Sequence, residues 1–176
     1  MSVLRPPNEG RSTRKGADVE KLSLILWRER ELLELLAYKL ELERLVLGSG
    51  HSRWLAQANR EVEDVVVTLR ETEVLRAMAA DEAAHEVGLD TNPSLSALAE
   101  AANEPWRTIL LDHRDAFLVV TREIAELSDT NKGLITAGYR SAQETLLAIR
   151  GTAEGYTPDG VAVPAAPARR LVDRSL

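Results

Sequence analysis

The longest periodic run of apolar residues in the chain lies between Pro105 and Arg150. Its apolar positions recur at alternating steps of four and three residues, which is the repeat of a helix lying along another helix. The positions of this stripe are mostly large and apolar in its first half and small or hydroxylated in its second half: Trp106, Leu110, His113, Phe117, Val120, Ile124, Leu127, Asn131, Leu134, Gly138, Ser141, Thr145 and Ala148. No proline interrupts the run, so one continuous helix of roughly 70 Å is predicted. Such a helix cannot bury its stripe alone and needs other helices.

Two more long helices precede it. The first is predicted over 18–47, with Asp18 as its N-cap and Gly48 as the residue after its end. It carries two adjacent apolar stripes, a wider face than a two-stranded coiled coil requires. They comprise Leu22, Leu26, Leu33, Leu36, Leu40 and Leu47, and Ile25, Leu32, Leu35, Leu42, Leu45 and Val46. A face this wide fits either a three-helix core or a bundle with surface left over for a partner.

The second long helix is predicted over 52–86. Its apolar positions are Leu55, Ala58, Val62, Val65 and Leu69, and then Leu75 and Met78. After Met78 the apolar residues are mostly alanine, so we expect the end of this helix to pack weakly. A short connecting helix over 93–101 follows, with Asn92 as its N-cap and a proline in its first position.

These elements predict an all-α fold, an elongated antiparallel bundle of three long helices with a short connecting helix and flexible termini. The bundle domain covers 18–150, with the third long helix over 105–150. Residues 1–17 are expected to form a disordered basic arm, and 151–176 are expected to form a flexible tail rich in glycine and proline.

Charge is distributed unevenly along the chain. The net charge is −6, yet residues 1–17 carry four basic side chains against Glu9, a charge of +3. Residues 151–176 are neutral, so the helical body 18–150 carries −9. An acidic helical body does not predict nucleic-acid binding and suits a partner with basic or neutral faces. No apolar segment has the length of a signal peptide or a membrane span, so we expect a cytoplasmic protein that does not insert into membranes.

Candidate catalytic and metal sites are weak. The chain has no cysteine, which excludes disulfides, thiolate metal sites and cysteine nucleophiles. Glu82 and His85 have the spacing of one half of a di-iron carboxylate site, but the chain has no second Glu-x-x-His pair. The many glutamates alternate with arginines at helical spacing, which is typical of a solvated helix face. We expect no enzyme activity, no metal and no cofactor.

Two polar residues, His113 and Asn131, occupy positions of the long apolar stripe. A polar residue in such a stripe often sets the register between helices, at a cost in stability. We favour that role for Asn131. The alternative is that these side chains face solvent, and the sequence leaves this open for His113.

The order of these elements resembles the FlgN family of flagellar type III export chaperones. The resemblance covers about 20–160, and its most specific part is 123–134. There Leu127, Asn131 and Leu134 follow that family's Leu-Asn-x-x-Asn-x-x-Leu stretch, with Ser128 in place of the first Asn. The segment from Tyr156 to Gly160 is similar to the Tyr-x-x-x-Gly segment that follows the last helix in that family.

The resemblance implies a cytoplasmic chaperone for hook–filament junction proteins. It would bind their C-terminal helical segments, keep them from premature assembly and deliver them to the flagellar export apparatus. A client helix can lie in a groove between helices, which the spare apolar face of the first helix and the small residues of the third would form. The expected client-binding residues are Leu127, Asn131, Leu134, Ile135, Leu146, Leu147 and Ile149. Tyr156 is expected to dock on the export gate, and the alternative is that its ring packs back on the third long helix.

Other functions fit the same helical pattern. Each expected client-binding residue could instead belong to the chain's own core. The chain could also be a self-associating coiled-coil assembly protein, with a homodimer as its simplest form. A helical metal-binding bundle is a weaker third possibility.

Overall fold

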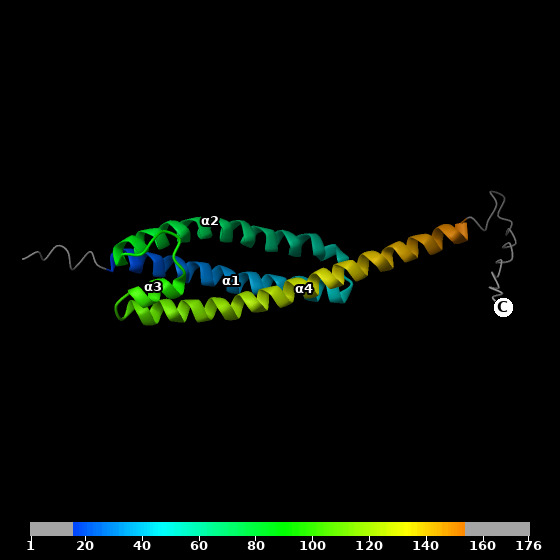
Figure 1. The fold of residues 1–176 in the computed structure, drawn as a ribbon. Coiled ribbons are helices and arrows are strands. Elements are labelled where there is room, and N and C mark those ends of the chain that lie inside the picture. The colour runs from blue at the N-terminus through cyan, green and yellow to red at the C-terminus, as the bar shows by residue number, and fades with distance from the viewer. Residues whose placement is uncertain (1–15, 154–176) are drawn as a thin grey trace, which may run out of the picture. The chain divides into compact units, whose positions relative to one another are not determined.

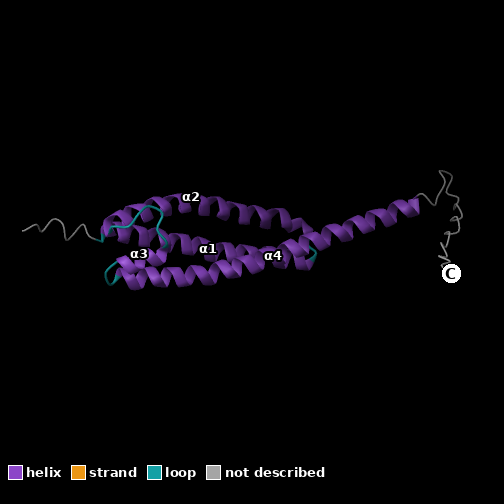
Figure 2. Cartoon of the chain, in the orientation of Figure 1, coloured by secondary structure: helices purple, strands orange, loops and turns teal. Residues whose placement is uncertain are grey.

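The computed structural model of the chain describes residues 16–153, with side chains through residue 150. The described residues form helices joined by turns and contain no strand (Figure 2). Our predictions for the basic arm and the glycine- and proline-rich tail concern mostly residues outside this range. The helices are α1 (Ala17–Ser49), the 3₁₀ turn η1 (Ser52–Trp54), α2 (Leu55–Val87), α3 (Leu95–Ala101) and α4 (Trp106–Ala153).

The chain divides into two compact units after Leu134, and the described residues of the first unit form a helical bundle. In this unit α1 runs antiparallel to α2, since Lys21 pairs with Glu82 and Lys39 pairs with Glu61. The first part of α4 runs parallel to α1 and contacts it through hydrogen bonds given below. The three helices therefore alternate in direction along the chain, with α1 in contact with both others (Figure 1). The predicted all-α bundle of long helices with a short connecting helix is confirmed.

The main core lies where α1, α2, α3 and the start of α4 meet, and its centre is built from small side chains. Ala79, Ala83 and Ala84 of α2 are completely inaccessible to solvent. Short side chains on one helix allow neighbouring helices to approach closely, so an alanine-rich face can be a dense core. The other buried members are Val19, Leu22, Leu26, Ala80, Leu98, Ala99, Ala102 and Leu110. Our prediction that α2 packs weakly after Met78 is wrong, because those alanines pack against leucines of three other helices.

The phase predicted for the second half of α2 is also wrong. Leu75 and Met78 are 56% and 59% exposed, while Thr72 and the alanines turn inward. A second, smaller core cluster, centred on Leu36, Leu40 and Val65, lies farther along α1 and α2. Apolar side chains from α2 and α4 pack against it, namely Val62, Val66, Leu69, Ile124 and Leu127.

Three predicted helix ends need correction. The N-cap of α1 is Gly16, so Asp18 lies in the first turn. The backbone N–H groups of Gly16 and Asp18 instead donate to the carboxylate of Glu86 in α2, which supplies the missing acceptor from another helix. Helix α1 ends later than predicted, at Ser49, and a left-handed Gly50 with φ 70° caps it.

The third correction concerns α3. Its N-cap is Ser94, whose hydroxyl accepts a hydrogen bond from the N–H of Ala97. Asn92 lies in the preceding turn with a positive φ of 57°, and its N–H donates to Asp81. Asparagine adopts this left-handed conformation more readily than most residues, which explains its place in the turn.

Residues 135–153 form the described part of the second unit and continue helix α4. The predicted stripe of α4 is buried or half-buried from Trp106 to Asn131. After Asn131, every side chain through Arg150 is exposed. One sequence pattern therefore covers two parts of α4, a first part whose stripe packs on the bundle and a second part that is exposed.

Candidate functional site

Helix α1 is apolar on two opposite faces. Leu22 and Leu26 point into the core, whereas Leu24 and Trp27 are 66% and 51% exposed. Toward the other end of α1, Tyr38, Leu45 and Leu35 are also exposed. Helical spacing brings these residues onto one side of α1, which we call the outer face of α1: Leu24, Trp27, Leu35, Tyr38, Leu42 and Leu45. A helix that is apolar all round is normally covered on all sides, so this face has the composition of a contact surface.

The sequence analysis predicted part of this face and missed its most exposed large side chains. The second stripe predicted on the first helix contains Leu35, Leu42 and Leu45, but it omits Leu24, Trp27 and Tyr38. The available signal was a third apolar stripe with an average step of 3.5 residues, which runs from Leu24 to Leu45 with Glu31 as its one charged position.

A cavity of about 560 Å³ opens between α1 and α4 beside Trp27. Its walls are mostly apolar and aromatic, and two carboxylates lie among them. The lining residues are Glu20, Ser23, Leu24, Trp27, Arg30, Trp106, Ile109, Asp112 and His113. Ligand sites in proteins commonly have volumes of about 300–1,000 Å³ and combine apolar walls with a few polar groups.

The side chain of His113 is buried between α1 and α4, with 2% of its surface exposed. Its Nε2 lies 3.3 Å from the hydroxyl of Ser23, and its ring makes an edge contact with Trp27 at 5.0 Å between centroids. The Nδ1 atom is buried without a hydrogen-bond partner. Burial lowers the pKa of His113, and the nearby guanidinium of Arg30 lowers it further, so both favour the neutral ring. The solvent-facing alternative for His113 is therefore wrong.

Asn131 joins α4 to α1 at the other end of the bundle. Its amide nitrogen donates to the carbonyl oxygen of Leu40 at 2.9 Å and to the carboxylate of Glu43 at 2.8 Å. Asn131 and Glu43 are both buried, at 3% and 5% exposed. Both hydrogen bonds of the Asn131 amide are made to groups on α1. They therefore fix how far α4 is shifted along α1, as expected of a residue that sets the register between helices.

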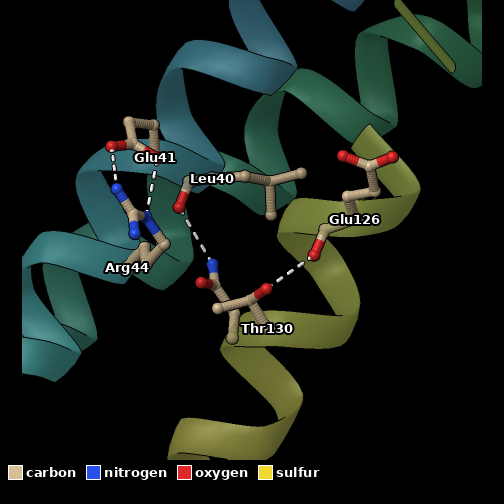
Figure 3. Close-up of polar contacts among 6 residues, drawn as sticks. Leu40, Glu41, Arg44, Glu126 and Thr130 are labelled. Atoms are coloured by element: carbon tan, nitrogen blue, oxygen red, sulfur yellow. Dashed lines mark hydrogen bonds and ion pairs between the residues drawn. The ribbon is translucent and has the colours of Figure 1, made fainter. Parts of the chain in front are cut away.

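Polar contacts on both helices surround this junction (Figure 3). The amide contact to Leu40 lies beside the ion pair of Arg44 with Glu41. On α4, the hydroxyl of Thr130 donates to the carbonyl oxygen of Glu126 one turn earlier. These neighbouring bonds lie within single helices, whereas those of Asn131 link two helices.

The predicted client-binding residues fall into two groups. Leu127 is half-buried against the smaller core cluster and Asn131 is buried, so both are used inside the bundle. The other five are exposed to solvent by 36% to 68%: Leu134, Ile135, Leu146, Leu147 and Ile149. Tyr156 lies outside the described residues.

The exposed part of α4 carries an apolar stripe of its own. Ile135, Tyr139, Ala142, Leu146 and Ile149 follow one another at steps of four, three, four and three, which places them on one side of the helix. This stripe is one residue out of phase with the predicted positions Gly138, Ser141, Thr145 and Ala148. Tyr139, at 66% exposed, was not among the predicted site residues.

Groups that could bind a metal are scattered over the described part of the chain. No cluster of three or more His, Asp or Glu side chains lies there in a geometry that could hold a metal ion. Glu82 of the Glu82–His85 pair forms an ion pair with Lys21 instead. Among the helices described, none has both the length and the apolar composition of a membrane span.

The described residues form an all-α bundle that leaves apolar stripes exposed on α1 and on the last part of α4, which places the chain in the class of helical-bundle proteins with apolar contact surfaces. The model of one protein family, described as FlgN protein, matches residues 18–164. The chain therefore belongs to the FlgN family, a family of flagellar export chaperones that is not enzymatic and that binds flagellar hook-associated proteins and the export apparatus. The chain matches no curated protein and no solved structure.

Proposed function

We propose that this chain is a cytoplasmic chaperone for hook–filament junction proteins. It binds the C-terminal helical segment of such a protein, keeps the client from assembling early and delivers it to the flagellar export apparatus. Membership of the FlgN family supports the general role. The choice of client segment and of the surface that binds it is our own inference from the exposed part of α4.

The observation that carries the proposal is the apolar stripe from Ile135 to Leu146. Ile135, Tyr139 and Leu146 are 49%, 66% and 60% exposed, and they lie on one side of a helix in which every side chain from 132 to 150 is exposed. An amphipathic helix buries its apolar side against other helices. A helix from another protein, with apolar residues at the same spacing, can cover this stripe.

Leu134 and Leu147 flank the stripe and widen the contact surface. Leu147 is 68% exposed, and Leu134 is 36% exposed where the bundle gives way to the second unit. In this proposal Ile149 extends the stripe by one more position. Leu127 and Asn131 take part indirectly, because they hold the earlier part of α4 on the bundle. Tyr156 remains the proposed docking residue for the export gate.

A single charge on the stripe tests the surface. Leu146→Asp places a carboxylate in the proposed contact, and we expect loss of the complex with a hook–filament junction protein in gel filtration with light scattering. Because Leu146 is already exposed, the circular dichroism spectrum should keep its helical signal. Val119→Asp is the matched control, since Val119 is 69% exposed on an earlier part of the same helix. Retention of the complex by Leu146→Asp would reject this surface.

Self-association is the second candidate function, because the heptad spacing of the stripe also fits a coiled coil between two copies. That function predicts a particle mass at a multiple of 19.4 kDa that does not change when client is added. The chaperone function predicts a one-to-one complex that is lost when the client's C-terminal helix is deleted.

A further inference from the structure

The outer face of α1 is a second apolar surface, and the proposed function makes no use of it. It extends from Leu24 to Leu45, which is roughly 30 Å along the helix at 1.5 Å per residue. The cavity beside Trp27 lies at its first end. Both features belong to the bundle before Leu134 and are distinct from the proposed client-binding stripe of α4.

Unpaired charge on this surface is negative. All five basic side chains of α1 are already in ion pairs within the chain: Lys21, Arg28, Arg30, Lys39 and Arg44. Glu20 and Asp112, which line the cavity, have no ion-pair or hydrogen-bond partner for their carboxylates among the described residues. The surface therefore offers two acidic groups and has no unpaired basic group on α1 to offer.

Aromatic rings lie next to these carboxylates. The indoles of Trp27 and Trp106 line the same cavity as Glu20 and Asp112. Arg30 also lines it and already lies over the Trp27 ring, 5.4 Å from its centroid, whereas none of the described residues places a cation over Trp106. Indole faces attract guanidinium and ammonium groups, and carboxylates pair with them. The aliphatic part of an arginine or lysine side chain also packs well on apolar walls. Together these groups suit the side chain of an arginine or a lysine.

We propose that the outer face of α1 and this cavity bind an amphipathic helix of a partner protein, with an arginine or lysine of that helix between Glu20 and Asp112. Its apolar side covers Leu24, Trp27 and the apolar residues that follow them along α1. A second copy of this chain is a poorer occupant. A parallel second copy would bring Glu20 and Asp112 against the same groups of its partner, and like charges in a contact oppose association. An antiparallel copy would bring to them only basic side chains of α1 that are already in ion pairs within their own chain.

Synthetic helical peptides are the probe. Each carries leucines at i, i+3, i+4 and i+7, and arginines stand at its N-terminal end in one version and at its C-terminal end in another. A third version has glutamates in place of the arginines. Binding is followed by tryptophan fluorescence of the full chain carrying Trp54→Phe, which leaves Trp27 and Trp106 as reporters. We expect at least one arginine peptide to bind and the glutamate peptide to bind about tenfold more weakly or less.

Two pairs of matched variants locate the site. Glu20→Gln with Asp112→Asn should weaken the arginine peptide about tenfold, and Asp64→Asn with Glu71→Gln on α2 should change it less than about twofold. Both pairs remove two exposed or half-exposed acidic groups, so they change net charge equally. Leu24→Ser should weaken the peptide, while Leu75→Ser, at a comparably exposed leucine of α2, should not.

Two results would overturn the proposal. One is an equal loss of arginine-peptide binding in the two pairs of variants that remove acidic groups. It would show that the peptide is attracted by the net negative charge of the chain and not by the cavity. The other is a concentration-dependent dimer in sedimentation that Leu24→Ser abolishes, which would assign the outer face to a second copy. Neither result bears on the client-binding surface of α4, so failure here is separable from failure of the proposed function.

Discussion

Asn131→Ala should destabilise the bundle strongly for a single polar side chain. The substitution removes the amide that bonds to the carbonyl of Leu40 and to the carboxylate of Glu43. A hydrogen bond to a charged group contributes about 1.5–3 kcal/mol and one between neutral groups about 1 kcal/mol. The Oδ1 atom of Asn131 has no partner, so removing it returns part of that loss. We therefore expect a net loss of about 2–3 kcal/mol in the free energy of unfolding.

Urea unfolding followed by circular dichroism measures this loss. Asn59→Ala is the matched control, because Asn59 is exposed and bonds only to Glu63 one turn away. Exposed pairs at this spacing contribute about 0.2–0.5 kcal/mol. A second comparison uses Glu43→Gln: the double variant with Asn131→Ala should lose less than the sum of the two single variants, because Asn131→Ala removes the hydrogen bond that Glu43→Gln weakens.

The reasoning fails if Asn131→Ala loses no more stability than Asn59→Ala. It also fails if the losses from Asn131→Ala and Glu43→Gln simply add. In either case Asn131 would be a buried residue of little energetic consequence, and the assignment of α4 register to it would be wrong.

Two further predictions concern the core and its pH dependence. Ala83→Leu should destabilise the chain by about 1–3 kcal/mol, because Ala83 is completely buried where four helices meet. Ala77→Leu, on the exposed side of α2, should be near neutral. Equal effects of the two variants in urea unfolding would show that the alanine face is loosely packed. Burial lowers the pKa of His113 below its ordinary 6.5, with Arg30 adding to the shift and Asp112 opposing it, so the folded state favours the neutral ring. The stability that the neutral ring contributes is present above pH 6.5 and is lost as the pH falls from there through the lower pKa of the folded state. The wild type should therefore lose stability in that pH range relative to His113→Gln. Parallel profiles of unfolding free energy against pH for the two proteins would contradict the burial of a neutral His113.

The fold was largely predictable from the sequence because the signals for it are local. Alternating steps of four and three residues mark the buried side of α4, and buried residues occur there at Leu110, His113, Val120 and Asn131. Glycines mark the breaks, as at the left-handed Gly88 that ends α2. The helix ends were less predictable, because the backbone N–H groups at the start of α1 are satisfied by Glu86, a residue of another helix.

The failed predictions depend on distances between helices, which a sequence period does not contain. The alanines after Met78 indicated weak packing when α2 was considered alone. They are buried in the main core because α3 and the start of α4 also meet there. In the same way, the stripe of α4 did not reveal where burial ends, so the half-buried Leu127 and the exposed Leu134 held equivalent positions in it.

The predicted client-binding residues likewise divide into exposed residues and residues packed within the bundle. Leu134, Ile135, Leu146, Leu147 and Ile149 are exposed as a client-binding surface requires, whereas Leu127 and Asn131 are used within the bundle. The cavity beside Trp27 was missed, because it combines side chains from α1 with Trp106, Ile109 and Asp112 of α4. The unpaired acidic groups in it could be recognised once every basic side chain of α1 had been assigned to an ion pair.

Hydrogen–deuterium exchange of α4, with and without a hook–filament junction protein, tests the central claim most directly. In the chain alone, amides of 135–150 should exchange much faster than those of 106–131, because the earlier part packs on the bundle and the later part is exposed. Addition of the client should slow exchange in 135–150, and a client that lacks its C-terminal helix should leave it unchanged. Exchange in 135–150 that is already slow in the chain alone, or that the intact client does not alter, would contradict the account.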